Sequence, residues 1–344
     1  MGLFDQQHEY FGLDIGSTGI RLVQLKRGEG KPSLVTYGHV ALPPGLTVSD
    51  APADIAKVAE AVKSLVKQSH VSTKYVVAGL SSSKVFASII TTPRLSEAEL
   101  RKAITLQADQ YVPMALKDVK LDWVVVGPKG KADQEVLLVA APNTTTEKYL
   151  SIFEQADLEL LALEPNSIAL ARALVQPSDL AIITLDIGNL SSDITIVHSN
   201  MPKLIRSVNT GGQTFVRAVA QNLGLDEVQA DQFTRKFGLT QTKLEGQVYR
   251  AIKPSLDQVL AELQKSVQFF SGQYPEVKVE KIVISGGAVV LPELITYVST
   301  ATGMPVEVAN AWTKVAYPAN LQENLMQISI EYGVAVGLAE RNLV

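Results

Sequence analysis

Residues 11–25 read FGLDIGSTGIRLVQL. Apolar residues alternate around Asp14, as in a β-strand, and the pattern resumes at Ile20 after a short turn. The turn consists of glycines and small hydroxyl side chains, so its backbone N–H groups can approach an anion closely. The stretch therefore predicts a strand, a phosphate-binding turn and a returning strand, although the same pattern is also typical of an ordinary β-hairpin.

The chemistry of this stretch suits a nucleotide phosphate. Gly16, Ser17 and Thr18 form the part of the turn that would contact the anion. The carboxylate of Asp14 is a hard oxygen ligand of the kind that Mg²⁺ prefers. Arg21 follows on the returning strand, and a guanidinium group can also contact phosphate.

The same pattern occurs a second time at residues 180–197, which read LAIITLDIGNLSSDITIV. Asp186 lies 172 residues after Asp14, which is half the length of the chain. One Asp-x-Gly tripeptide is expected by chance in a chain of this length. Two copies in matching strand–turn–strand frames indicate a duplicated domain, and they make the ordinary-hairpin interpretation much less favourable.

Composition is consistent with a folded protein of two lobes. The chain has 344 residues, more than the roughly 250–300 at which a single core usually divides. It is 46% hydrophobic and 19% charged, with a net charge of −4 and no basic block, so nucleic-acid binding is not expected. There is no cysteine, and the four histidines show no metal-ligand spacing.

The N-terminus and the apolar segments give no membrane signature. The first residues lack the basic start and apolar core of a secretory signal. No apolar run approaches the 18 residues that would predict a membrane-spanning helix. We therefore expect a cytoplasmic protein without direct membrane insertion.

A small α+β unit is predicted between the two copies of the motif. After the two strands of the first hairpin, a third strand, a helix capped by Asp54 and a buried strand at 75–80 complete a first set of elements. Residues 81–163 then contain strands, a helix opened by the capping box of Ser96 and Glu99, and a further helix at 146–156. The pattern predicts an inserted subdomain.

Two glycine pairs mark further candidate sites in the second half. Gly211 and Gly212 precede a predicted helix, and backbone N–H groups at a helix start suit an anion. Gly286 and Gly287 follow an apolar strand, and they would allow a flat ring or a ribose to lie against the backbone. Residues 216–275 are predicted to be helical, and Pro254 is expected to open the best helix there.

Five of these motifs, in order, resemble those of the actin, Hsp70 and sugar-kinase superfamily. They are a first phosphate loop (14–18), a first connecting helix (Glu164, Pro165 and Ala169), a second phosphate loop (186–189), an adenosine motif (285–288) and a second connecting helix (333–337). The glycines and small residues of the last helix permit close packing of another element. The resemblance implies an α/β, ribonuclease H-like and actin-like fold of two duplicated lobes. It also implies that ATP and Mg²⁺ bind in the cleft between the lobes.

The resemblance also implies roles for individual residues. Asp14 and Asp186 would hold Mg²⁺ through water, and Asp186 and Glu164 would be catalytic, with Glu164 orienting the attacking water. Such a site mainly positions groups and neutralises charge, so we expect at most slow Mg-dependent ATP hydrolysis. The implied nucleotide-binding residues are Gly16, Ser17, Thr18, Arg21, Gly188, Asn189, Gly211, Gly212, Gly286 and Gly287.

Within the superfamily, the inserted unit resembles the SHS2-like 1C subdomain of FtsA and PilM. The opening residues MGLF, the phrase GLDIGS at 12–17 and the segment LQADQYVP at 106–113 are similar to the PilM family of type IV pilus assembly. FtsA usually ends in an amphipathic membrane-binding helix, which this sequence lacks after its last helix. The expected subdomains are 1A (8–80 and 164–185), 1C (81–163), 2A (186–215 and 276–344, with the closing helix) and 2B (216–275).

The family resemblance implies a scaffold. It would bind ATP, bind the N-terminal cytoplasmic peptide of a PilN-like inner-membrane protein, and link that protein to pilus motor proteins. It would be cytoplasmic and peripheral at the inner membrane through its partner. The alternatives are an FtsA-like cell-division scaffold, a small-molecule kinase of the same superfamily, and a degenerate scaffold without ATP, which the intact Asp14 and Asp186 argue against.

Overall fold

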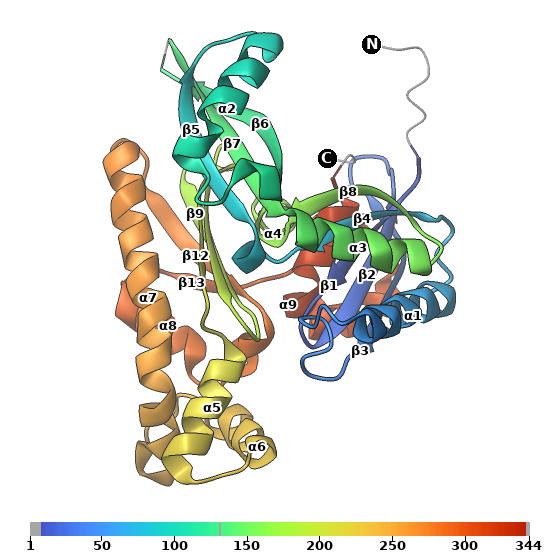
Figure 1. The fold of residues 1–344 in the computed structure, drawn as a ribbon. Helices are drawn as coiled ribbons and strands as arrows, with labels where there is room; N and C mark the ends of the chain where they lie inside the picture. The colour runs from blue at the N-terminus through green and yellow to red at the C-terminus, as the bar shows by residue number, and fades with distance from the viewer. Residues whose placement is uncertain (1–7, 131, 342–344) are drawn as a thin grey trace. The chain divides into compact units, whose positions relative to one another are not determined.

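The structure is a computed structural model, and it describes residues 8–130 and 132–341 (Figure 1). The opening residues MGLF and the last three residues of the expected subdomain 2A lie outside the described residues. The chain forms two compact units. One contains the residues up to Lys84, Pro142–Ala173 and the residues from Asn310 on, and the other contains Val85–Ala141 and Leu174–Ala309.

The first unit is built on a five-stranded sheet in the order β3-β2-β1-β4-β8. β1, β2 and β3 pair antiparallel, and β4 and β8 add in parallel on the other side of β1. The predicted order of three strands, a helix and a strand is confirmed. The strands are β1 (Phe11–Ile15), β2 (Gly19–Lys26), β3 (Ser33–Ala41), β4 (Tyr75–Leu80) and β8 (Glu159–Pro165).

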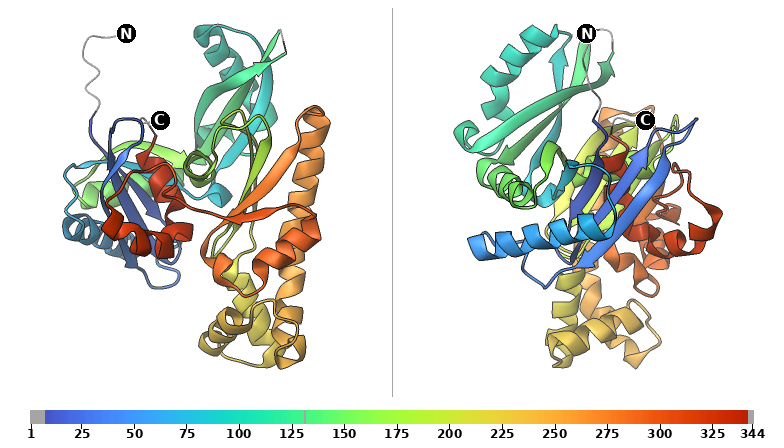
Figure 2. Two further views of the ribbon diagram at one scale, coloured as in Figure 1. Left: turned by 180° about the vertical axis from the view of Figure 1, so that it is seen from behind. Right: turned by 90° about the vertical axis from the view of Figure 1, so that its right-hand side faces the viewer.

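Helices cover this sheet. α1 and α3 pack together, and Figure 2 shows α1 running across the strands. α9 packs on β1 and β2. The helical elements are α1 (Pro52–Gln68), η1 (Ser82–Lys84), α3 (Asn143–Gln155), α4 (Asn166–Leu174), η5 (Ala319–Leu321) and α9 (Gln322–Ala339).

Two glycines allow α9 to approach its neighbours closely, as its composition predicted. A Cβ on Gly12 of β1 would lie 2.4 Å from the carbonyl oxygen of Ala335 in α9. A Cβ on Gly337 of α9 would lie 1.8 Å from the carbonyl oxygen of Ala169 in α4. Backbone atoms cannot yield at such distances, so these positions require glycine for α9 to pack where it does.

The second unit repeats the strand order of the first unit. Its five-stranded sheet has the order β11-β10-β9-β12-β13, again with three antiparallel strands followed by parallel ones. The duplication predicted from the two Asp-Ile-Gly motifs is therefore present in the fold. The strands are β9 (Ala181–Ile187), β10 (Ser192–His198), β11 (Met201–Val208), β12 (Val279–Ser285) and β13 (Val306–Val308).

A helical group packs against this second sheet and shares its apolar core. Its long helix α7 begins at Gln247, so the expectation that Pro254 opens this helix is wrong. Buried residues continue on both sides of the proline, from Val248 to Phe270, and this apolar stripe holds the helix together across it. The helical elements are α5 (Gly212–Leu223), α6 (Glu227–Phe237), η3 (Leu244–Gly246), α7 (Gln247–Gln273), η4 (Gly287–Val290) and α8 (Leu294–Thr302).

The inserted module is an α+β element of the second unit. Its three-stranded sheet has the order β5-β7-β6, and α2 packs on it with the predicted capping box of Ser96 and Glu99. Its elements are β5 (Phe86–Pro93), α2 (Glu97–Tyr111), η2 (Leu116–Asp118), β6 (Val119–Lys129) and β7 (Asp133–Pro142). No helix within the described ranges combines the length and apolar character needed to cross a bilayer.

Three further sequence expectations differ from the structure. α3, which was expected inside the inserted subdomain, packs against α1 in the first unit. α9, which was expected in subdomain 2A, packs on the first sheet. The N-cap of α1 is Ala51, and Asp54 lies in the first turn. The first two differences arise because the order of elements along the sequence does not specify which sheet the apolar face of a helix packs against.

Candidate functional site

The first phosphate loop is a tight turn between β1 and β2. The backbone N–H of Gly16 donates to the carbonyl oxygen of Gly19 at 2.9 Å and closes the turn. Asp14, at the end of β1, is only 7% exposed. Among the described residues, no acceptor lies within hydrogen-bond distance of the backbone N–H groups of Ser17 and Thr18. These two donors are therefore open to an anion, and their contact with phosphate stays a prediction.

Arg21 lies beside this loop, but its charge is shared. It is the cross-strand partner of Asp14, and its Nη1 is 3.8 Å from where a Cβ on Gly16 would be. Its Nη2 forms an ion pair with the carboxylate of Glu331 in α9. Sequence reasoning did not find this partner, because Glu331 is 310 residues away along the chain.

Tyr149 of α3 is a further neighbour that sequence reasoning missed. Burial, together with the negative charge of Asp14, raises the pKa of the Tyr149 hydroxyl. The hydroxyl group therefore remains a neutral hydrogen-bond donor near this carboxylate at any physiological pH. No local pattern pointed to Tyr149, since it lies in a helix that was expected to belong to the inserted subdomain.

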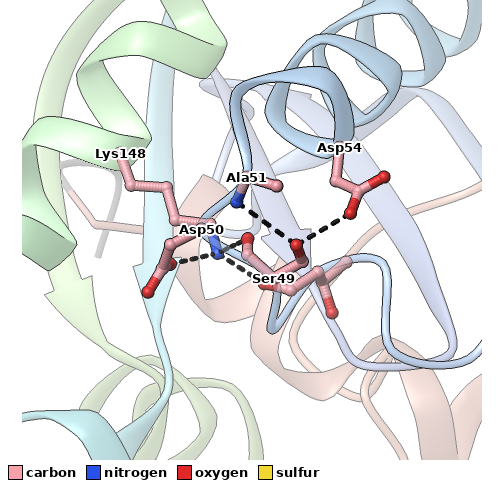
Figure 3. Close-up of polar contacts among 6 residues, drawn as sticks. Ser49, Asp50, Ala51, Asp54 and Lys148 are labelled. Carbon is pink, nitrogen blue, oxygen red and sulfur yellow. Dashed lines mark hydrogen bonds and ion pairs between the residues drawn. The ribbon is translucent and has the colours of Figure 1, made fainter.

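Lys148, the residue before Tyr149, holds a loop in place (Figure 3). Its Nζ donates to the carbonyl oxygens of Thr47 and Ser49 at 3.0 and 2.5 Å, and to Oδ1 of Asp50 at 2.9 Å. This hydrogen bond with Lys148 lowers the pKa of Asp50. All three ammonium donors are thus used within the protein. Lys148 ties α3 to the segment between β3 and α1 and has no donor left for a phosphate.

Glu164, the predicted water-orienting residue, lies in an ion-pair network at the end of β8. Both of its oxygens accept from Arg172 of α4, with Nη1 to Oε2 at 3.0 Å. Nη1 of Arg172 also donates to the carbonyl oxygen of Gly337 at 2.7 Å, and Arg341 lies 3.6 Å from Oε2. The structure therefore gives Glu164 a part in joining β8, α4 and α9, while its catalytic role stays a prediction.

The second phosphate loop repeats the first. The backbone N–H of Gly188 donates to the carbonyl oxygen of Ser191 at 3.0 Å. In the part of the chain that the structure describes, the N–H groups of Asn189 and Leu190 have no acceptor within hydrogen-bond distance. Asp186, at the end of β9, accepts a hydrogen bond of 2.7 Å from the Ser285 hydroxyl. The second loop thus offers an anion the same pair of backbone donors.

The start of α5 supports this loop. The N–H groups of Gly212 and Gln213 donate to the carbonyl oxygens of Gly188 and Asn189, each at 2.9 Å. A Cβ on Gly211 would lie 2.5 Å from the carbonyl oxygen of Gly188. The amide of Gly212 is thus engaged within the protein, so the expected phosphate contact through it is not supported. Gly211 allows the start of α5 to pack closely against the loop, whereas a Cβ on Gly212 would meet its nearest atom at 3.6 Å, an ordinary contact.

The two glycines after β12 have different surroundings. Gly286 has a φ of +93°, and a Cβ there would lie 2.4 Å from the carbonyl oxygen of Ile187 and 2.8 Å from Oδ1 of Asp186. Apart from its own neighbours in the chain, no described residue places a heavy atom within 4 Å of the Cβ position of Gly287. Gly286 therefore packs tightly against the second loop, and Gly287 borders open space of the kind that a flat ligand needs.

The carboxylates of Asp14 and Asp186 are of the kind that binds Mg²⁺ brought by a nucleotide. Within residues 8–130 and 132–341, no group of three His, Cys, Asp or Glu side chains is placed to hold a metal ion. Asp14 and Asp186 lie at strand ends beside open backbone donors. Mg²⁺ commonly uses one or two carboxylates together with water and phosphate oxygens, so each carboxylate, beside the loop of its own unit, suits an ion that a nucleotide brings.

The family follows from comparison with known proteins. The family profile described as type IV pilus assembly protein PilM matches residues 12–343. The chain belongs to the PilM family. A solved chain from a PilM-PilN type IV pilus biogenesis complex is 27% identical, with a TM-score of 0.85, and the match covers 98% of this chain and 99% of that one.

More distant structures show the same fold as this PilM-family chain. The ethanolamine utilization protein EutJ from Carboxydothermus hydrogenoformans is 15% identical, with a TM-score of 0.57 over 96% of this chain and 88% of that chain. MreB 5 of Spiroplasma citri, bound to AMPPNP, is 11% identical, with a TM-score of 0.53 over 96% and 95% of the two chains. The predicted actin-like α/β fold is confirmed.

Proposed function

We propose that this PilM-family chain is an ATP-binding scaffold of type IV pilus assembly that passes its nucleotide state to a PilN-like partner. The observation that carries the proposal is the repeated hairpin. In both units an aspartate lies at the end of a central strand and a glycine closes the turn. Two backbone N–H groups of each turn have no acceptor among residues 8–130 and 132–341. Such a pair of turns matches the two phosphate loops of an actin-like ATPase.

Each unit has residues that would bind the phosphates or the metal ion of Mg-ATP. The backbone N–H groups of Ser17 and Thr18, and of Asn189 in the second loop, would bind phosphate oxygens. Asp14 and Asp186 would hold Mg²⁺ through water, and the ion would neutralise phosphate charge. MreB5 of Spiroplasma citri has been solved with AMPPNP and with ADP, which is consistent with nucleotide binding in this fold.

We expect hydrolysis to be slow. Both oxygens of Glu164 accept hydrogen bonds from Arg172, so this carboxylate is a poor acceptor for a proton from water. Arg21 is shared with Glu331, which weakens its grip on a transferred phosphoryl group. The bound nucleotide would therefore act chiefly as a signal, and the chain at most as a slow Mg-dependent ATPase.

The partner would be the N-terminal cytoplasmic peptide of a PilN-like inner-membrane protein. The solved chain from the PilM-PilN complex matches this chain over nearly its whole length, which supports a partner of the same kind. Binding would place the chain in the cytoplasm, peripheral at the inner membrane, where it would link its partner to the pilus motor proteins.

ATP titration tests the nucleotide half of the proposal. Asp14→Ala should weaken Mg-ATP binding on the order of 10- to 100-fold, because a charge-assisted contact contributes about 1.5–3 kcal/mol. Asp157→Ala is the matched control, since Asp157 also belongs to the first unit but forms an exposed ion pair with Lys63. Failure of the unsubstituted chain to bind ATP calorimetrically would refute an ATP-binding scaffold.

Peptide binding tests the partner half separately. The chain should bind a synthetic peptide of the cytoplasmic N-terminus of PilN from the same genome, and the affinity should differ with and without Mg-ATP. A peptide of the same composition in scrambled order is the control. If the native peptide binds no better than the scrambled one, and a sugar or polyol accelerates ATP turnover, the small-molecule kinase becomes the better interpretation.

A further inference from the structure

A cavity with a volume of about 180 Å³ lies inside the second unit, away from the phosphate loop of that unit. It is formed where the inserted module meets β11 and the last turns of α7. Its walls include Ile89 of β5, Lys129 of β6, Glu135 of β7, Lys203 of β11, and Phe269 and Tyr274 near the end of α7. None of the nucleotide-binding motifs contributes to it.

A buried carboxylate lies in the wall of this cavity. The side chain of Glu135 is 1% exposed and that of Lys203 is 7% exposed. Oε2 of Glu135 accepts from Nζ of Lys203 at 2.6 Å, and Oε1 accepts from the Tyr274 hydroxyl. Burial and the neighbouring Glu135 raise the pKa of Tyr274, so the hydroxyl group remains a neutral donor. Lys203 and Tyr274 therefore already satisfy Glu135.

Lys129 brings a second ammonium group to Glu135, whose single negative charge is already paired with Lys203. Its Nζ is 3.9 Å from Oε1 of Glu135 and donates to Oε1 of Gln273 at 3.1 Å. It also lies 5.4 Å from the centre of the Tyr274 ring. An ammonium group has three donors, so Lys129, with a side chain that is 33% exposed, can still bind an anion from solution.

The charged residues in the wall of the cavity have a positive balance, since Lys129 and Lys203 are cations and Glu135 is the carboxylate that the lining contains. Outside the lining, Glu276 is near enough to Tyr274 to raise its pKa as well. The guanidinium carbon of Arg206 lies 5.9 Å from the centre of the Phe269 ring.

An apolar surface adjoins these cations. Phe269 is 54% exposed, which is unusual for so large an apolar side chain, and it lines the cavity together with Ile89. A ligand that placed an anionic group at Lys129 would bring its attached carbons against Phe269. The cavity has the volume of about six liquid water molecules, which is enough for a carboxylate on a short apolar group.

We propose that this cavity binds an organic carboxylate, with the carboxylate on Lys129 and its apolar part against Phe269. The ligand is either an acidic side chain in a segment of a partner protein or a free small carboxylic acid, since both present the same chemistry. The site lies apart from the phosphate loops, so the proposal is independent of ATP binding.

Isothermal titration calorimetry of the full chain with four probes tests the site. The probes are 3-phenylpropionate, its neutral analogue 3-phenylpropionamide, acetate, and the peptide N-acetyl-Phe-Glu-amide. We expect saturable binding of the phenylpropionate and the peptide, and none of the other two at the same concentration. Tighter binding of the peptide identifies a protein segment as the ligand, and tighter binding of the free acid identifies a small molecule.

Substitutions then assign the binding to this cavity. Lys129→Met should weaken binding of the carboxylate probes by about tenfold or more while leaving Glu135 paired with Lys203. Phe269→Ser should weaken it by several-fold. Lys281→Met is the matched control, because Lys281 also forms an ion pair with a glutamate in the second unit, on β12.

Three results would overturn the proposal. They are no saturable binding of either carboxylate probe, equal binding of the neutral amide, and the same loss of affinity in the Lys281→Met control as in Lys129→Met. Thermal unfolding of each variant by circular dichroism verifies that it is folded. Should Lys129→Met fail to fold, Lys129→Gln and Phe269→Ser provide the same test.

Discussion

The two phosphate loops have the same backbone hydrogen bonding, but the charged residue opposite the aspartate differs between them. In both hairpins a glycine N–H closes the turn, at 2.9 Å in the first and 3.0 Å in the second. The residue opposite the aspartate differs, because Asp14 faces Arg21 and Asp186 faces Asp193. Directly opposed residues on antiparallel strands lie on one face of the sheet, so the first loop has an ion of opposite charge beside its carboxylate and the second has a like charge.

The second hairpin offsets this like charge with hydroxyl groups. Ser285 donates to Asp186 at 2.7 Å, and Ser207 donates to Asp193 at 2.5 Å. The first hairpin instead shares Arg21 with Glu331 of α9. The duplication therefore preserved the turn that faces an anion, while each unit developed its own way of balancing the neighbouring charges. We expect the second loop to depend more on a bound cation than the first.

The largest effect should come from the glycine that presses on the second loop. Gly286→Ala places a side chain at a φ of +93° and 2.4 Å from the carbonyl oxygen of Ile187, so unfolding free energy should fall by about 3 kcal/mol or more. The adjacent Gly287→Ala is the control, since its Cβ meets open space. Urea unfolding followed by circular dichroism measures both. Equal losses in the two variants would show that β12 does not constrain this loop.

The stability of the first unit should depend on pH through one buried carboxyl group. Glu340, at the end of α9, is fully buried, and burial raises its pKa to about 7 despite the opposing influence of Lys314 and Arg172. A carboxyl with a raised pKa stabilises the fold below its unfolded pKa of about 4.5, and this stabilisation is lost as pH rises through 7. Glu340→Gln should therefore be more stable than the original chain at pH 8, by about 2–3 kcal/mol.

The two tryptophans allow this effect to be assigned to one unit. Trp312 is buried in the first unit, and its indole N–H donates to the carbonyl oxygen of Leu325. Trp123→Phe leaves Trp312 as the single tryptophan, so its fluorescence reports unfolding of the first unit. Both chains should unfold alike at pH 4.5. A difference that is the same at pH 4.5 and pH 8 would mean that Glu340 does not titrate in this range.

An intermediate effect should follow from the hydroxyl that serves Asp186. Ser285 is 1% exposed, so Ser285→Ala removes a buried donor to a carboxylate and should cost about 1–2 kcal/mol of unfolding free energy. Ser207→Ala removes the equivalent donor to Asp193 at an exposed position and should cost less. Thermal unfolding compares the two. A larger loss for Ser207→Ala would reverse our account of how the second hairpin balances its charges.

The smallest effect should come from releasing Arg21. Glu331→Gln removes a partly exposed ion pair, so unfolding free energy should change by about 0.5 kcal/mol. ATP affinity should rise about two- to threefold, because the guanidinium group is then free to face the first loop. Glu323→Gln, in the first turn of the same helix, is the control. Weaker ATP binding by Glu331→Gln would indicate that Glu331 holds Arg21 in its binding position.

Several parts of the fold were predictable from local sequence. The strand–turn–strand frames around Asp14 and Asp186, the capping box of Ser96 and the close packing of the last helix all follow from spacing within a few residues. The helices α3 and α9 were expected in other subdomains, because an amphipathic pattern shows that a helix packs without showing on which sheet. The prediction that Pro254 opens a helix was wrong for a related reason, since the packing of α7 outweighs the preference of proline for the first turn of a helix.

In the candidate site, too, some features were predictable from local sequence and others were not. Repeated Asp-Ile-Gly motifs were enough to predict two phosphate loops, because a turn and its backbone donors depend on adjacent residues alone. The partners of Arg21 and Asp186 were not predictable, since Glu331 and Ser285 lie 310 and 99 residues away along the chain. Arg172 is only eight residues from Glu164, but the direction of its side chain depends on how α4 packs. The sequence by itself therefore determined which turns have backbone N–H groups that could bind an anion. The tertiary structure decided which charged side chains near these turns are already paired within the protein.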